Sequence, residues 1–350
     1  MRHPIRLLAL GVALTPMLSS RTQDAVGFRC EVAISPTDTD FGTFSGIAPG
    51  PDGRSAWTDG RSRQFSIRDS RGKVRVVGRP GSGPGEFQYV AGMDWIGDTL
   101  WVADGQLPRV QLFSDTGRLI RVITTVRPAA WGAVGGDSLA GFGNVPLGRD
   151  APFAVLASYE GSTAVDTIAV FPLIPAERFP LPPRMALNKQ PLLPETAIGW
   201  SPNHLRFCGA KQDGESLQIR CVDRRGVQVL SRSIRIEPRS LTDAVYDGVV
   251  RKWSEGPDRT EAAMRDLIRR PRSLPLVLEM QVENEGGMWL RRSHESEPSA
   301  VWTRLNKDGS VGRSFTLPRG HRLLRADAQY LWLTSSDTDG LQTVHRCILQ

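Results

Sequence analysis

The stretch GRPGSGPGEF, residues 78–87, followed by AGMDWIGDTLWVAD, residues 91–104, decides the fold. The pattern indicates a glycine-rich turn, an apolar strand, a Gly-Asp turn and a second strand that carries Trp101. Weaker copies of the second half recur along the chain with a bulky aromatic residue at the same place: Trp57, Trp101, Trp289 and Trp332. Recurrence at about 40 residues is typical of blades stacked around an axis.

The segments between these strands repeat as well. Polar turns that end in glycine, at 69–72, 114–117, 223–226 and 307–309, separate segments that alternate between apolar and polar residues. Such alternation indicates half-buried antiparallel strands, and glycine allows the positive φ that tight hairpins need. Because proline cannot donate to a strand ladder, it suits an outer edge. A proline lies near the end of each expected unit: Pro36, Pro80, Pro128, Pro172, Pro238 and Pro318.

Six such ends predict an all-β fold, a six-bladed β-propeller of four-stranded antiparallel blades. The blades are expected at about 42–80, 88–128, 129–172, 195–238, 274–318 and 320–350. The last stretch has room for three strands only. We therefore expect the N-terminal strand at 28–34 to supply the fourth strand and close the ring, so that the propeller covers residues 28–350.

The expected order of the strands also indicates how the four cysteines pair. Cys347 falls on the third strand of the last blade and Cys30 on the strand expected beside it, while Cys208 and Cys221 fall on neighbouring strands of the fourth blade. Neighbouring strands bring Cα atoms within reach of a disulfide. We predict the disulfides Cys30–Cys347 and Cys208–Cys221; the alternative is four buried free thiols. In chain-entropy models, a closure that spans nearly the whole chain is worth about 4–5 kcal/mol.

Residues 1–20 have the pattern of a secretory signal peptide. Arg2, His3 and Arg6 form a basic start, residues 7–18 are apolar, and two serines follow. This apolar run is too short to span a bilayer comfortably, and its cleavage site is not defined by a clean small-residue pair. No apolar run near 18 residues comes later. We expect a mature chain without a membrane span, in the periplasm or outside the cell.

The net charge of +7 does not by itself indicate a nucleic-acid partner. Only five of the 44 basic residues are lysine, and the arginines are spread along the chain without a cluster. Nucleic-acid binding calls for a basic patch or stripe, so we expect none here. A closed propeller leaves only short, protected edges, so we expect a monomer.

Two stretches interrupt the repeat. Residues 173–194 hold six prolines and are expected to form a stiff, irregular loop. Residues 239–273 are expected to form a helical insertion between the fourth and fifth blades. Ser240 or Thr242 would cap a first helix, and a second would run over 258–270 until Pro271 ends it.

The run at 81–87, followed by strand, turn and WVAD at 101–104, resembles the NHL-repeat type of six-bladed propeller. The chain from about 28 to 350 is similar to exported propellers abundant in Gemmatimonadota-type bacteria, in this loop and in a helical insertion before the fifth blade. The resemblance implies a fold and no catalytic residues. A phosphate loop would need a helix after the glycines; a strand follows, so the run is expected to be a structural turn between blades.

Both interruptions should lie on the top face, where the outer strand of one blade leads to the inner strand of the next. Loops on a rigid scaffold are where binding groups concentrate. We expect a non-enzymatic exported scaffold that binds a protein, peptide or glycan on this face, beside Arg251, Lys252, Trp253, Arg265 and Arg269. The alternative reading of the helices is that they cover apolar surface.

A second hypothesis is a metal-dependent hydrolase or lyase of the gluconolactonase-like kind, with no cofactor other than a channel Ca²⁺ or another divalent cation. Inner strands would supply Asp94, Glu279 and Asp327, a thin ligand set for a hard cation. Other chemistry has weaker support. The five histidines show no metal-ligand spacing, and no Gly-x-Ser-x-Gly, His-Glu-x-x-His or Cys-x-x-Cys motif occurs.

Overall fold

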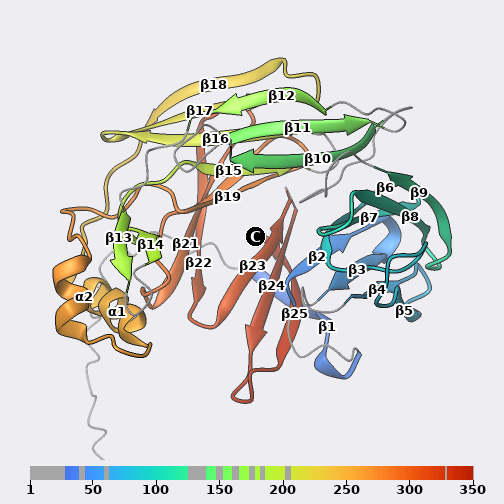
Figure 1. Ribbon diagram of the computed structural model, residues 1–350, viewed down its shortest axis with the longest axis horizontal. Coiled ribbons are helices and arrows are strands. Elements are labelled where there is room, and N and C mark those ends of the chain that lie inside the picture. The colour runs from blue at the N-terminus through green and yellow to red at the C-terminus, as the bar shows by residue number, and fades with distance from the viewer. Residues whose placement is uncertain are drawn as a thin grey trace, which may run out of the picture.

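The computed structural model describes residues 28–38, 44–58, 63–124, 139–146, 153–159, 165–172, 178–181, 186–201, 206–327 and 329–349. The expected signal peptide lies outside these residues. Within them, the chain is almost entirely antiparallel sheet, and the sheets follow one another around the molecule (Figure 1). Alternating burial along the strands, as in β15 and β17, is the pattern of half-buried strands that the sequence indicated.

Five sheets have four strands each. The first two are formed by β2 (Gly46–Pro49), β3 (Ser55–Thr58), β4 (Phe65–Arg68) and β5 (Val74–Val77), and by β6 (Val90–Ile96), β7 (Thr99–Asp104), β8 (Arg109–Ser114) and β9 (Leu119–Thr124). Two more are formed by β15 (Ala197–Ser201), β16 (Arg206–Asp213), β17 (Ser216–Val222) and β18 (Gln228–Arg235), and by β19 (Glu279–Val282), β20 (Met288–Arg291), β21 (Ser299–Leu305) and β22 (Val311–Pro318).

The fifth sheet joins the two ends of the chain. It consists of β23 (His321–Ala326), β24 (Tyr330–Ser336), β25 (Gln342–Leu349) and β1 (Phe28–Ile34), and β1 pairs with β25 as the outer strand. The predicted closure by the N-terminal strand is therefore confirmed. Short 3-10 helices, η1 (Pro36–Asp38) and η2 (Pro51–Gly53), follow β1 and β2.

Six four-stranded blades were expected, and the described residues form five. The stretch expected as the third blade forms a three-stranded sheet of β10 (Leu139–Pro146), β11 (Phe153–Tyr159) and β12 (Val165–Phe171). Its expected inner strand, at about 131–135, lies outside the described residues. Counting units by the prolines at their ends does not test whether each unit pairs four strands, which is why the sequence pattern overcounted.

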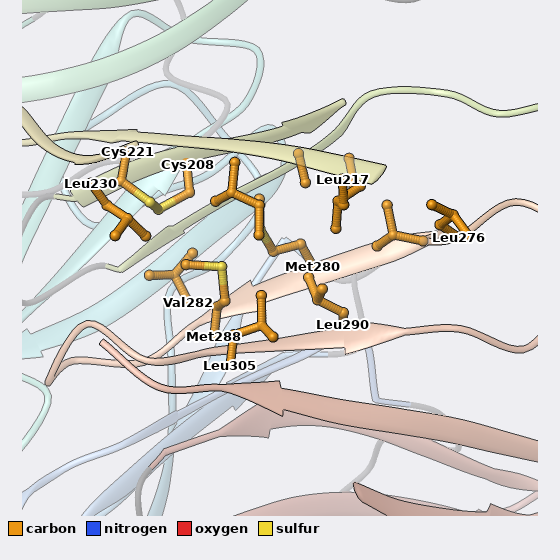
Figure 2. Close-up of a cluster of buried hydrophobic side chains, with 14 of the residues drawn as sticks. Cys208, Leu217, Cys221, Leu230, Leu276, Met280, Val282, Met288, Leu290 and Leu305 are labelled. Carbon is orange, nitrogen blue, oxygen red and sulfur yellow. A yellow bond between two sulfur atoms is a disulfide. The ribbon is translucent and has the colours of Figure 1, made fainter. Parts of the chain in front are cut away.

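Both predicted disulfides are present. Cys30 is paired with Cys347 in the β1–β25 register, and Cys208 with Cys221 in the β16–β17 register. Figure 2 shows Cys208–Cys221 beside Leu230, in the apolar core that the β15–β18 sheet shares with Met280, Met288 and Leu305 of the β19–β22 sheet. Two disulfides in one chain are typical of an oxidising compartment outside the cytoplasm.

Two helices, α1 (Asp243–Ser254) and α2 (Glu261–Leu267), lie between β18 and β19. Of the two residues expected as the cap, Ser240 and Thr242, it is Thr242 that caps α1, since its hydroxyl accepts a hydrogen bond from the amide of Val245. The second helix is shorter than the expected 258–270 because Thr260 caps it and Ile268 is already extended. The stretch 173–194, expected as irregular, contains the hairpin β13 (Arg178–Leu181) and β14 (Ala186–Lys189).

The helices cover apolar surface beside this hairpin. Val249, Val250 and Met264 are buried against Phe179 and Leu192. Figure 1 shows α1 and α2 together at one side of the molecule, next to β13 and β14. Among the described residues, no helix is long and apolar enough to cross a membrane.

Candidate ligand-binding channel

Five inner strands, β2, β6, β15, β19 and β23, line one central cavity. Each contributes one side chain to what we call the middle level of the channel: Ile47, Asp94, Trp200, Gln281 and Arg325. In every case the register pairs that residue with a buried aromatic residue on the second strand of its sheet. These partners are, in the same order, Trp57, Trp101, Phe207, Trp289 and Trp332.

This equivalence explains the period seen in the sequence. The recurring tryptophans are core residues, and the position opposite them on the inner strand is the one that faces the channel. The middle level is therefore formed by the structurally equivalent residue of the inner strand in each of five sheets. It combines an ion-pairing acid and base with an amide, an indole and an aliphatic side chain.

The cavity at this level has a volume of about 390 Å³. Toward the top face, its walls are small or apolar at Gly92, Ile198 and Leu324, and Glu279 supplies the one charge. A second cavity, of about 690 Å³, lies at the opposite end, where turns lead from inner to second strands; Gly50, Gly97 and Gln329 line it. The cavity at the middle level has the volume of a small-molecule or side-chain site.

Asp94 and Arg325 form the polar centre of the middle level. The carboxylate of Asp94 is fully buried; its Oδ2 accepts from Nη1 of Arg325 at 2.5 Å, and its Oδ1 accepts from the amide of Trp95 at 2.8 Å. Burial raises the pKa of Asp94, although the charge and hydrogen bond of Arg325 act in the opposite direction. Both carboxylate oxygens are engaged by protein donors.

The three acids expected as metal ligands lie at three different levels. Asp94 is on the middle level; Glu279 is two residues before Gln281, toward the top face; Asp327 is two residues after Arg325 and lines the other cavity. Two residues along a strand span about 6–7 Å, which is too far for carboxylates on different strands to share one ion. In the described part of the chain, no three acid, histidine or cysteine side chains gather as a metal site.

Each of these acids has protein partners instead. Glu279 is 3.3 Å from Nε of Arg291. Asp327 accepts from the amides of Gln329 and Tyr330, so that it shapes the turn between β23 and β24.

Two of the four basic residues expected to border a top-face site are paired with acids. Lys252 contacts Glu295 at 2.5 Å, and Arg265 contacts Asp247 at 2.7 Å; the latter hydrogen bond raises the pKa of Arg265. Trp253 packs edge-on against Phe179, with ring centroids 5.4 Å apart. Arg251 and Arg269 are exposed. These side chains surround the buried apolar cluster of the two helices.

In the glycine-rich loop, the carboxylate of Glu86 is bound by donors of the loop itself. Oε2 of Glu86 accepts from the amide of Gly83 at 2.7 Å, and Oε1 accepts from Nε of Arg79 at 2.9 Å. These donors lower the pKa of Glu86. Gln111 accepts from the amide of Gly85 and donates to the carbonyl of Glu86. The loop is thus an internally satisfied turn, as the strand that follows it indicated.

A smaller cavity of about 310 Å³ escaped the sequence-based predictions. It lies at the top ends of β15 and β19, where Thr196, Leu278 and Arg291 line it together with the buried His294. Burial lowers the pKa of His294, and its Nδ1 accepts from the amide of Ser296. No sequence spacing marks this group, because Thr196 and His294 belong to different sheets.

No protein-family model matches the sequence, and no curated protein matches it. Among solved structures, the chain is similar to a member of the DUF4221 family from Bacteroides vulgatus, with a TM-score of 0.50, 12% identity and coverage of 92% of this chain and 96% of that one. It also aligns with an exported protein from Bacteroides fragilis (TM-score 0.46, 11% identity, 95% and 98% coverage) and with virginiamycin B lyase from Staphylococcus aureus (0.45, 10%, 93% and 100%). At such identities, the first likeness shows the fold alone.

Proposed function

We propose that this chain is an exported, non-enzymatic binding protein that takes part of a protein, peptide or glycan into the channel cavity from the top face. The observation that carries the proposal is the middle level, where five sheets place one side chain each around a cavity of about 390 Å³. A largely apolar cavity with a few fixed polar groups is the usual form of a ligand site. The two disulfides and the signal-like N-terminus support a periplasmic or extracellular location.

The side-chain contacts favour binding over catalysis at this site. A general base needs a free carboxylate oxygen within reach of the proton that it takes. Asp94 gives both oxygens to Arg325 and Trp95, and Glu279 lies against Arg291. The alternative function, a metal-dependent hydrolase or lyase, would need acids that converge, and these stand at successive levels of the channel.

Within this proposal, the channel is favoured over the helical segment as the place of binding. Lys252 and Arg265 have acidic partners, and Trp253 is held by Phe179. Ile198 and Gly92, by contrast, line an open volume beside Asp94 and Arg325. A ligand that enters there would meet charge, amide and indole groups together.

A cavity-filling substitution tests the proposal. The mature protein is immobilised and probed with libraries of short peptides and of glycans, and each captured compound is checked for chemical change. We expect Ile198→Trp to abolish capture, and Ile120→Trp, at an exposed position on β9, to leave it intact. Equal capture by Ile198→Trp, conversion of a captured compound, or no capture by the unaltered protein would contradict the proposal.

A further inference from the structure

Two histidines meet on the sheet that closes the ring. His321 is the first residue of β23, and His345 lies on β25, two residues before Cys347. The register pairs His321 with Ser335 and His345 with Leu333, two neighbouring same-face positions of the intervening strand β24. The ring centroids are 6.4 Å apart, with 36° between the planes. The imidazoles therefore lean toward one another over the small side chain of Ser335.

The hydrogen bonding of this pair is incomplete. Nε2 of His345 lies 2.7 Å from Oγ of Ser335, which leaves its other ring nitrogen for a different partner. Nδ1 of His321 is buried and has no hydrogen-bond partner in the described part of the chain. A buried polar atom left unpaired costs about 1–3 kcal/mol, so a partner for this nitrogen would be stabilising.

Histidine side chains are suited to metal binding. A neutral imidazole offers a nitrogen lone pair, and histidine is the commonest protein ligand of transition metals. Zinc, copper and nickel suit imidazole, whereas calcium and magnesium require oxygen ligands.

We propose that His321 and His345 form a binding site for a divalent transition-metal ion of the Zn²⁺ or Cu²⁺ type, with water in the remaining positions and Ser335 beside it. Zn–N bonds of about 2.0–2.1 Å put the centroids of two rings that share an ion about 5–6 Å apart. The observed 6.4 Å needs only a small side-chain shift to reach that range. Because the protein supplies only two ring ligands, the bound ion exchanges with ions in solution.

The position of the site gives it a role. An ion held by His321 and His345 ties β23 to β25 across β24, in the sheet that Cys30–Cys347 also clasps. Binding to the folded chain alone stabilises it by mass action. The site shares no residue with the middle level of the channel. Failure of the proposed ligand site would therefore leave the metal-site proposal unaffected, and the reverse also holds.

The experiment uses the full mature chain, without an affinity tag, after chelator treatment and dialysis. ZnCl₂ is titrated calorimetrically, and the unfolding temperature is measured with and without it. We expect one equivalent to bind and the unfolding temperature to rise. In His321→Gln and His345→Gln, affinity should fall at least tenfold. His294→Gln is the matched control, because His294 is a buried histidine outside the pair, and it should bind like the unaltered protein.

A spectroscopic measurement on the unaltered protein removes any dependence on how the variants fold. The electron paramagnetic resonance spectrum of the Cu²⁺-loaded chain should show hyperfine coupling to two imidazole nitrogens. Equal Zn²⁺ binding in all three variants, coupling to fewer than two nitrogens, or no binding by the unaltered protein would overturn the proposal. CaCl₂ in place of ZnCl₂ should give no shift.

Discussion

Asp94 and Arg325 are joined by an ion pair of 2.5 Å although the inner strands that carry them are not neighbours. Their strands, β6 and β23, both adjoin β2, and Ile47 of β2 lines the same cavity as the pair. The bond links residues 231 positions apart and ties the second four-stranded sheet to the closing sheet. It is therefore both the polar centre of the candidate site and a brace across the ring.

Breaking this pair should be costly, and replacing it should not. Asp94→Asn leaves the guanidinium of Arg325 without its charged partner in a buried setting, and we expect a loss of about 3 kcal/mol in the free energy of unfolding. The double variant Asp94→Leu/Arg325→Met removes both charges and should recover most of that loss. Urea unfolding of Asp94→Leu, Arg325→Met and the double variant measures this coupling. Strictly additive losses of unfolding free energy would show that the two residues do not stabilise the fold as a pair.

The two disulfides should contribute unequally. Cys30–Cys347 has a sequence separation of 317, and Cys208–Cys221 one of 13. In the chain-entropy model, removal of the first by Cys30→Ala/Cys347→Ala costs about 5 kcal/mol, and removal of the second by Cys208→Ala/Cys221→Ala about 3 kcal/mol. Denaturant midpoints of both double variants test the order. A larger loss for the short loop would mean that packing in the core of Figure 2, and not chain closure, dominates.

Trp253 should affect stability and not binding. Its ring packs on Phe179, so Trp253→Ala opens a gap beside the helices and should cost about 2–3 kcal/mol. Arg265→Ala removes an exposed ion pair with Asp247 and should lower the free energy of unfolding much less than Trp253→Ala does. Thermal unfolding gives both values. Loss of capture in the peptide and glycan libraries by a folded Trp253→Ala protein would restore the helical segment as the binding place.

His294 should make stability depend on pH. Burial lowers its pKa below the ordinary 6.5, so the folded protein favours the neutral ring. As pH falls through the unfolded-state pKa of about 6.5, the unfolded chain takes up the proton first, and the free energy of unfolding falls until the folded-state pKa is reached. Unfolding curves from pH 7.5 to 5 should show this decline, and His294→Gln should weaken it. An unchanged slope in the variant would assign the decline to other groups, such as His345.

The glycine loop should behave as one unit with Glu86. A Cβ at Gly81 would lie 2.1 Å from Oε2 of Glu86, so Gly81→Ala displaces the carboxylate from the Gly83 amide. Glu86→Ala removes the same hydrogen bonds and should lower the free energy of unfolding. Because both changes disturb one interaction, the double variant should be less destabilised than the sum, as measured by urea unfolding. Fully additive losses in the free energy of unfolding would show that Gly81→Ala and Glu86→Ala disturb separate interactions.

The strand pattern was predictable because it depends on local regularities. Alternation and polar glycine turns reported the strands, and the register they imply was enough to pair Cys30 with Cys347 across the whole chain. Thr242 was one of two cap candidates, with Ser240, that the sequence placed before an apolar periodic segment. The number of four-stranded sheets was not predictable in this way, because a turn or a proline reports where a strand ends and not which strands pair.

The candidate sites show the opposite case. Asp94 and Glu279 are both acids of inner strands, yet register places them at different levels and gives each a basic partner. His321 and His345 have no metal-ligand spacing in the sequence, and they meet only because β24 brings Ser335 between them.

The sequence by itself thus determined the all-β repeat, the closure by the N-terminal strand and both disulfides, since these follow from the period of side chains along each strand. Tertiary structure alone decided which side chains meet in the channel and on the closing sheet. Those meetings depend on the register and order of whole sheets, and residues that lie hundreds of positions apart carry no local signal of one another.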